Sequence, residues 1–201
     1  MTSLPVAATC DPATVEELSA RPRAELVELF LGLPPLAAAE VAGVLSGELQ
    51  GRSPDYLVRL FASSAAADGF GEWLGKGFVA GGLPGGKWLG HGYNVWRTPA
   101  GVTRRVRFAW GTGLSLLDGR PVARIEYAPF ANAYAELDLR DEVRRLGDGL
   151  YLGIATSASA SAICPDPGGP LGRSLPTTFL LYGSLDSAAG PDDPAGERPA
   201  G

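Results

Sequence analysis

The chain is poor in the residues that most often hold metal ions. Its 201 residues include one histidine and two cysteines, His91, Cys10 and Cys164. Zinc and haem sites need sets of histidine or cysteine ligands, so the sequence predicts neither, and a carboxylate-only metal site is the alternative left open. We expect no metal and no cofactor. A disulfide between the two distant cysteines also stays open, but the cysteine framework typical of small secreted proteins is missing.

Charge and long apolar runs are scarce as well. Charged residues make up 19% of the chain, and the formal net charge is −5. A surface that binds nucleic acid needs a basic stripe, and the only dense basic run is Arg104, Arg105 and Arg107, so we expect no nucleic-acid partner. No apolar run approaches the roughly 18 residues that cross a membrane. The first residues lack the basic and then apolar regions of a signal peptide, which predicts a cytoplasmic protein without a membrane partner.

Glycine and proline, in contrast, are abundant, with 28 and 17 copies. Such frequent turn residues suit many short strands better than a helical bundle. Apolar residues at helical spacing occur only in the N-terminal third, where they predict helices over residues 13–31, 36–45 and 53–69. Pro22 suits the first turn of a helix that begins near Arg21, and Ser53 with Pro54 suits the start of the third helix.

From Gly71 onward apolar and polar residues alternate, which predicts strands. We expect nine of them, near residues 72–80, 87–97, 102–110, 114–117, 121–127, 132–137, 140–146, 150–156 and 178–185. The turn sequences at residues 99–101, 118–119 and 147–149 each end in glycine and are typical of hairpins. Sequential hairpins without crossover helices predict a mainly β fold, an antiparallel up-and-down barrel with helical segments at its N-terminal end.

The chain is expected to form one domain with two appendages. Residues 1–32 form a helical extension, residues 33–187 the barrel domain, and residues 188–201 a tail whose composition predicts disorder. The long connection over residues 157–178, rich in serine, alanine and proline, is either a lid or disordered.

A short phrase occurs twice at the start of the predicted barrel, as WLGKGF at residues 73–78 and as WLGHGY at residues 88–93. In a structural interpretation the glycines let bent strands close and the tryptophans fill the barrel. In a functional interpretation Lys76, His91 and Tyr93 point into an apolar cavity, where Lys76 and His91 are candidate catalytic residues. A register slip of one residue would reverse every assignment, so both interpretations stay open.

The charge-dense stretch LDLRDEVRRLG, residues 137–147, supplies further candidates. A solvated strand face with ion pairs across strands explains it in one interpretation. In the other, Asp141 or Glu142 faces the interior and serves as a general acid or base. The remaining candidates for ligand binding are aromatic or polar residues of the predicted strands, namely Trp73, Trp88, Tyr93, Phe108, Trp110, Tyr127, Asn132 and Arg144.

The order of these motifs resembles that of GXWXG-domain proteins. Leu-Pro-Pro at residues 33–35 precedes Gly-Val-Leu-Ser-Gly at residues 43–47, which has leucine in place of the family's tryptophan. Either copy of the repeated phrase resembles the family's Trp-x-Gly-Lys-x-Phe element. Residues 119–156 and the later FLLYGSL resemble the companion domain of unknown function, whose Asp-x-x-Arg pair matches Asp141 and Arg144. The resemblance covers roughly residues 33–185 and implies a lipocalin-like, or calycin-like, barrel without implying a reaction.

The sequence therefore predicts a barrel that binds a hydrophobic small molecule. The preferred hypothesis is a cofactor-independent enzyme of specialised metabolism, a cyclase, isomerase or lyase, because a cavity can hold a reactive conformer beside one acid or base. A non-catalytic carrier of an apolar ligand and an interaction module with a filled core are the alternatives. The oligomeric state is left open, a homodimer included.

Overall fold

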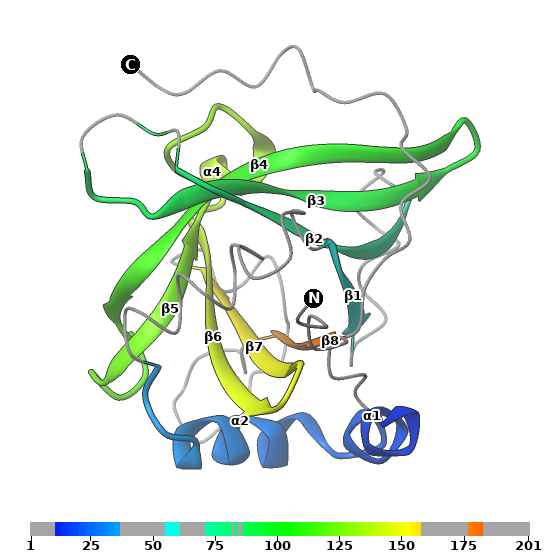
Figure 1. The fold of residues 1–201 in the computed structure, drawn as a ribbon, viewed down its shortest axis with the longest axis vertical. Coiled ribbons are helices and arrows are strands. Elements are labelled where there is room, and N and C mark those ends of the chain that lie inside the picture. The colour runs from blue at the N-terminus through cyan, green and yellow to red at the C-terminus, as the bar shows by residue number, and fades with distance from the viewer. Residues whose placement is uncertain are drawn as a thin grey trace, which may run out of the picture.

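The protein is an eight-stranded barrel with two helices at one end (Figure 1). The computed structural model describes residues 11–36, 55–60, 71–81, 83, 86–157 and 177–182. Both cysteines, most of the predicted helix over residues 36–45, most of the connection over residues 157–178 and the tail lie outside these described residues. The fold and the site below are built from the described part of the chain.

The strands follow one another around the barrel in sequence order, and each pairs antiparallel with its neighbours. Their bounds are β1 Asp55–Leu60, β2 Glu72–Ala80, β3 Gly90–Thr98, β4 Gly101–Leu114, β5 Pro121–Glu126, β6 Leu139–Gly147, β7 Leu150–Ser157 and β8 Thr177–Tyr182. Pairing of β1 with β8 closes the ring. The prediction of a mainly β, antiparallel up-and-down barrel is confirmed, and the architecture is consistent with a calycin-like barrel.

The helices α1, Pro12–Ser19, and α2, Arg23–Gly32, cover part of the outer surface. Asp11 caps α1 by accepting a hydrogen bond from the backbone N–H of Ala13, and Pro22 stands at the N-cap of α2. α2 contacts β7 and β8. An outer apolar cluster joins the helices to the barrel and consists of Val15, Leu18, Leu26, Val27, Phe30, Val122, Leu150, Leu152, Ile154 and Leu180.

Three predicted elements differ from the structure. The helix expected over residues 53–69 is wrong at Asp55–Leu60, which is β1, because pairing with β2 and β8 outweighs local helical spacing. The strand expected over residues 132–137 is instead the short helix α4, Ala133–Glu136, started by Asn132, whose side chain accepts hydrogen bonds from two backbone N–H groups. The separate strand over residues 114–117 is also wrong, because β4 itself runs for 14 residues to Leu114.

The predicted hairpin turns are confirmed. Gly101, Gly119 and Gly149 all have positive φ, between 66° and 119°. Glycine reaches this region without the steric cost that a Cβ atom adds, so these turns connect adjacent strands of the barrel with little strain.

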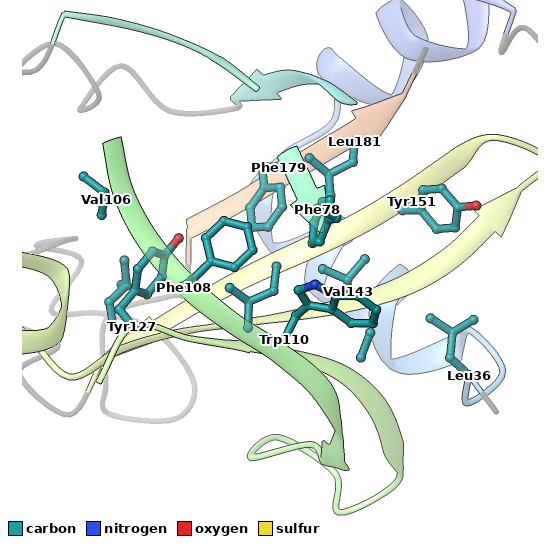
Figure 2. Close-up of a cluster of buried hydrophobic side chains, with 13 residues drawn as sticks. Leu36, Phe78, Val106, Phe108, Trp110, Tyr127, Val143, Tyr151, Phe179 and Leu181 are labelled. Atoms are coloured by element: carbon teal, nitrogen blue, oxygen red, sulfur yellow. The ribbon is translucent and has the colours of Figure 1, made fainter. Parts of the chain in front are cut away.

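The barrel interior is packed with aromatic side chains. Phe78, Phe108, Trp110, Tyr127 and Phe179 belong to one buried cluster drawn from β2, β4, β8 and the segment after β5 (Figure 2). Val143 and Leu181 extend the same cluster (Figure 2). The barrel interior, and not the outer surface, encloses the polar groups of the candidate site.

Candidate functional site: a buried polar cluster in the barrel

The register of β2 and β3 decides which residues of the repeated phrase face inward. Lys76 pairs with Asn94, whereas Gly77 pairs with Tyr93. Because successive side chains of a strand point to opposite faces, Lys76 and Asn94 share one face and Tyr93 lies on the other. Lys76 contacts Tyr127 and Asp141, which are buried in the interior, so the face that carries Lys76 and Asn94 is the inner one.

Lys76, Asn94, Tyr127 and Asp141 form what we call the interior polar cluster. The exposed fractions of these four residues are 1%, 0%, 1% and 3%. The Nζ atom of Lys76 lies 2.9 Å from Oδ1 of Asn94, 2.6 Å from the hydroxyl of Tyr127 and 2.9 Å from Oδ2 of Asp141. The Tyr127 hydroxyl donates in turn to Oδ2 of Asp141 at 3.0 Å. All three hydrogens of the ammonium thus have an oxygen to bind.

Aromatic rings surround the ammonium group of Lys76. Its Nζ atom lies 4.8 Å from the ring centroid of Trp73, 5.0 Å from that of Phe108 and 5.6 Å from that of Phe179. The ring of Tyr127 is at 5.3 Å. A cation within about 6 Å of an aromatic ring is attracted by the ring's quadrupole, so these walls partly compensate the loss of water around the charge.

Burial shifts the proton equilibria of the cluster. Desolvation lowers the pKa of Lys76 below its usual value, and the charge of Asp141 and its hydrogen bond oppose that shift. Desolvation, followed by the charge of Asp141, raises the pKa of Tyr127 well above 10. The cluster therefore contains an amine that gives up its proton more readily than a free lysine and a phenol that stays protonated.

Two irregularities in the strands shape this cluster. An extra residue, Leu74, interrupts the pairing of β2 with β3, so Trp73 and Lys76 both reach the interior although they are three positions apart. In β4 the buried Val106 has a φ of 58°, which is rare for a β-branched residue. Its carbonyl accepts a hydrogen bond of 3.0 Å from Nδ2 of Asn94. Strained backbone at a buried polar cluster is a feature that often accompanies function.

Inner-face glycines make room for the aromatic walls. A Cβ atom on Gly92 would lie 2.4 Å from the ring of Phe108, and one on Gly90 would lie 2.6 Å from that of Trp110. The indole Nε1 of Trp110 donates to the carbonyl of His91 at 2.9 Å and to that of Val79 at 3.1 Å. These positions of the second phrase therefore serve packing, as the structural interpretation expected.

The inward orientation that the functional interpretation gave to His91 and Tyr93 is wrong. His91 pairs with Val79 on the outer face, where its Nδ1 lies 3.1 Å from the carbonyl of Gly81. Partial burial lowers the pKa of His91. The guanidinium of Arg104 lies over the ring of Tyr93, with its Cζ atom 5.2 Å from the ring centroid. Neither residue meets the interior polar cluster, because the register of β3 places Asn94 there instead.

The charge-dense strand β6 divides its residues between two sites, and both are buried. Asp141 faces inward as described, whereas Glu142 and Arg144 lie on the outer face beneath other elements. Glu142 accepts a hydrogen bond of 2.5 Å from the backbone N–H of Leu116. The solvated strand face expected for this stretch is therefore wrong at Asp141, Glu142 and Arg144, all at most 3% exposed.

Arg144 joins the barrel to α2 and to the turn after β4. Its Nη1 donates to the carbonyl of Phe30 at 2.9 Å, and its Nη2 lies 2.8 and 2.9 Å from the two oxygens of Asp118. Its guanidinium also stacks 4.5 Å from the ring centroid of Phe30. Arg144 contacts no member of the interior polar cluster in these interactions, so its position supports a structural role.

Two further predicted ligand-binding residues lie away from the cluster. Trp88 precedes β3 and packs near Gly111, with Nζ of Lys87 4.5 Å from its ring. Asn132 caps α4 and donates from Nδ2 to the carbonyl of Arg107 at 2.9 Å. Neither of these interactions reaches the interior polar cluster.

Of the predicted site residues, the structure brings together Lys76, Asp141, Tyr127, Trp73 and Phe108, with Trp110 further along the interior. Sequence reasoning missed Asn94 and Phe179. Alternation along β3 puts Asn94 on the same face as Gly90, Gly92 and Trp96, and this pattern could have identified Asn94 as an interior residue. Phe179 belongs to the last strand of the barrel, and its contact with Trp73 at 5.7 Å depends on closure.

Comparisons with known proteins leave the chain without an assigned family. No family model matches it, and no curated protein matches it. A solved structure of a protein from Thermomonospora curvata aligns with 87% of this chain and 88% of its own, at 19% identity and a TM-score of 0.43. A likeness of that size carries no argument about what the chain does.

Membrane-spanning helices and groups of metal ligands are both missing from the described residues. Helices within residues 11–36 and 133–136 are all too short or too polar to cross a membrane. In the same described part of the chain, no three His, Cys, Asp or Glu side chains come together in a group that could hold a metal ion.

Proposed function

We propose that the barrel binds a small, mainly apolar molecule through its aromatic interior and acts on it as a cofactor-independent cyclase, isomerase or lyase. The observation that carries this proposal is the buried Lys76–Asp141 ion pair, enclosed by aromatic rings together with Tyr127 and Asn94. Small-molecule sites are typically apolar with a few convergent polar groups, and this interior has that composition. We also propose that the protein is a distant relative of the GXWXG-domain proteins and that it is located in the cytoplasm.

Energetics favour a functional reason for the cluster. Well-packed apolar side chains often stabilise a core as much as a buried ion pair does, so such a pair is weak evidence for stability alone. Buried groups with shifted pKa values gather at functional sites, and Lys76 and Tyr127 are both shifted. The bulge at Leu74 and the positive φ of Val106 further distort the strands at this place.

The cluster offers the parts needed for proton transfer. In this mechanism Lys76 accepts a proton from a carbon or oxygen of the bound molecule when it is in the neutral form that burial favours. Asp141 stabilises the resulting ammonium, and Tyr127 donates a hydrogen bond to oxygen on which negative charge develops. The rings of Trp73, Phe108 and Phe179 hold the molecule's apolar part in place.

A non-catalytic carrier is the second candidate, and one observation favours it. The three hydrogens of the Lys76 ammonium already have three oxygen partners within 2.9 Å. A fully satisfied cluster can act as a fixed polar contact for a ligand without exchanging protons.

Binding is tested by native mass spectrometry of the protein purified from its own host. We expect a retained molecule that is mainly apolar and carries one polar group. Isothermal titration of the purified protein with a panel of apolar alcohols, ketones and lactones checks the result independently. A protein that retains nothing and binds none of the panel contradicts the proposal and favours an interaction module with a filled core.

The variant Tyr127→Phe distinguishes an enzyme from a non-catalytic carrier, because it keeps the ring and removes the hydroxyl. An enzyme predicts that turnover of the retained molecule falls by about 100-fold or more while affinity changes little. A carrier predicts no turnover in either protein and a change in affinity only. Tyr93→Phe, which makes the same chemical change on the outer face, serves as the matched control and is expected to leave turnover and affinity unchanged.

A further inference from the structure

We propose that Lys76 forms an imine with an apolar aldehyde or ketone held in the barrel, so that the substrate or ligand class is a carbonyl compound. This inference rests on the proposed binding function and specifies the chemical class of the bound molecule. Its basis is a single buried amine that faces a carboxylate and a phenol and is walled by aromatic rings.

The distribution of lysine in the chain singles this residue out. The sequence contains two lysines, Lys76 and Lys87, against 15 arginines. Lys87 is exposed and stacks beside Trp88, whereas Lys76 lies in the interior. Arginine stays protonated and is the usual choice where only a permanent charge is needed, whereas a buried lysine can lose its proton and attack carbonyl carbon. A chain rich in arginine thus places one of its two lysines in the interior, where it is 1% exposed.

Burial shifts Lys76 toward its neutral, nucleophilic form. An exposed lysine with a pKa near 10.4 is neutral in about one molecule in 2,500 at pH 7. Burial lowers the pKa of Lys76 and so raises the neutral fraction. The carboxylate of Asp141 lies 2.9 Å from Nζ and can accept the proton that leaves it, and the protonated hydroxyl of Tyr127, 2.6 Å from Nζ, can pass a proton on. Amine, proton acceptor and hydrogen-bond donor are therefore in contact before any carbonyl compound binds.

The reaction balances without a cofactor. The nitrogen lone pair of the neutral amine forms a bond to the carbonyl carbon, and the π pair of the C=O bond moves to oxygen. The two amine hydrogens leave with that oxygen as water, relayed by Asp141 and Tyr127, and a C=N bond remains. Counted from the ammonium form, lysine ammonium and aldehyde give iminium and water, so a single positive charge stands opposite Asp141 both before and after the reaction.

This conservation of charge suits the buried position. The Asp141 carboxylate, 2.9 Å from Nζ, would pair with the iminium as it pairs with the ammonium. A buried carboxylate without a partner costs several kcal/mol, and imine formation avoids that cost. The aromatic rings around Nζ supply apolar walls for the organic part of the aldehyde or ketone.

The test is reductive trapping with cinnamaldehyde and sodium cyanoborohydride at pH 7, followed by peptide mass mapping. A reduced imine adds the mass of the aldehyde less one oxygen atom. We expect this adduct on the peptide that contains Lys76, at least about tenfold more than on the peptide that contains Lys87, because the buried amine is the less protonated one. The α-amine of Met1 is resolved on its own peptide.

Matched variants assign the adduct to one of the two lysines. Lys87→Arg removes the exposed lysine and is expected to retain the adduct in full. Lys76→Arg keeps a positive charge opposite Asp141 and cannot form an imine, so it is expected to lose the adduct. Circular dichroism and thermal unfolding confirm that each variant folds. If Lys76→Arg does not fold, Lys87→Arg alone decides, since Lys76 is then the only lysine in the chain.

Cinnamyl alcohol distinguishes failure of the imine from failure of binding. It has the carbon skeleton of cinnamaldehyde and lacks the carbonyl group, so it can bind without forming an imine. If calorimetry shows that the alcohol binds, and cinnamaldehyde still leaves no adduct on Lys76, the imine is overturned and the proposed binding function stands. No binding of the alcohol, no adduct on Lys76 and no retained molecule would overturn both.

Discussion

Lys76 and Asp141 form an ion pair that crosses the inside of the barrel, with Nζ and Oδ2 2.9 Å apart. Lys76 belongs to β2 and Asp141 to β6, and these two strands share no backbone pairing, because the neighbours of β2 are β1 and β3. The pair therefore links the two sides of the barrel through the interior.

Asp141→Asn should destabilise the protein strongly. The substitution leaves the ammonium of Lys76 buried without its counter-charge, and breaking a buried ion pair in this way typically costs about 3 to 5 kcal/mol. Denaturation by urea measures the loss. Glu72→Gln, which removes the partner of Arg97 in an exposed ion pair between β2 and β3, is the control, with an expected loss below about 1 kcal/mol. Equal losses in the two variants would show that the interior pair contributes nothing specific.

Asp118 should make the protein sensitive to acid. Its hydrogen bonds with Arg144 hold the pKa of Asp118 well below its ordinary value of 3.8. A lowered folded pKa gives stability that is present above the unfolded pKa and is lost as the pH falls below it, because the unfolded chain then binds the proton more readily. The free energy of unfolding of the wild type should therefore fall as the pH drops below about 4.

The variant Asp118→Asn isolates this contribution. It should cost about 1 to 3 kcal/mol at pH 7, through weaker bonds to Arg144, and should show a shallower loss of stability in acid. Asp148→Asn, at the exposed turn between β6 and β7, is the control and should follow the wild type. Parallel acid curves for wild type and Asp118→Asn would contradict the prediction.

Gly92 should not tolerate a side chain. A Cβ atom there would lie 2.3 Å from the carbonyl oxygen of Gly77 and 2.4 Å from the ring of Phe108. Overpacking of this kind typically costs about 1 to 3 kcal/mol, so Gly92→Ala should lower the thermal midpoint. Gly111→Ala, whose Cβ would meet nothing nearer than 3.4 Å, should change stability by less than about 1 kcal/mol. A reversed order of the two variants would mean that the interior is looser than the structure describes.

Tyr127 should lower the stability of the protein at high pH. Burial raises the pKa of Tyr127 well above 10, so the folded state keeps a proton that the unfolded chain releases near pH 10. Stability from this group is therefore present below pH 10 and is lost as the pH rises further. Lys76 acts in the opposite sense, because its folded pKa is lowered and the unfolded chain binds the proton more readily up to about pH 10.5.

Chemical denaturation between pH 9 and 11 separates the two groups. Because wild type and Tyr127→Phe share Lys76, the difference between them isolates the tyrosine. The stability advantage of the wild type over Tyr127→Phe should shrink as the pH rises above 10. An advantage that stays constant would show that Tyr127 titrates alike in the folded and unfolded states.

The strands and the turns between them were the most predictable part of the structure. The bounds of β2 follow from its alternation, and the glycines of the turns mark hairpins by local geometry. β1 was missed because Leu57 and Leu60 also fit helical spacing, and pairing with β2 and β8 decides in favour of a strand. α4 was missed because the capping side chain of Asn132 acts on backbone groups that alternation does not describe.

The candidate site was predictable one residue at a time but not as an arrangement. Lys76 stood out in the repeated phrase, Asp141 in the charge-dense stretch over residues 137–147, and Tyr127 among the aromatic candidates for ligand binding. Which of them meet depends on register and on bulges, and the extra residue at Leu74 cannot be located from the alternation of side chains alone. For that reason the orientation of His91 stayed open, with an interior position only in the functional interpretation, and Asn94, on the opposite face of the same strand, was overlooked.

The hydrogen bond from Asn94 to the carbonyl of Val106 affects which ligands the barrel can prefer. Because Nδ2 is held by that carbonyl, only Oδ1 can be turned toward Lys76, and an aspartate at this position would set a carboxylate against a carbonyl oxygen. The amide thus keeps the interior polar cluster electroneutral, with one ammonium and one carboxylate. A neutral guest preserves this neutrality, whereas a fatty acid or another organic anion would add a second negative charge beside Asp141. The barrel should therefore prefer aldehydes, ketones and alcohols to the carboxylic acids of the same carbon skeleton.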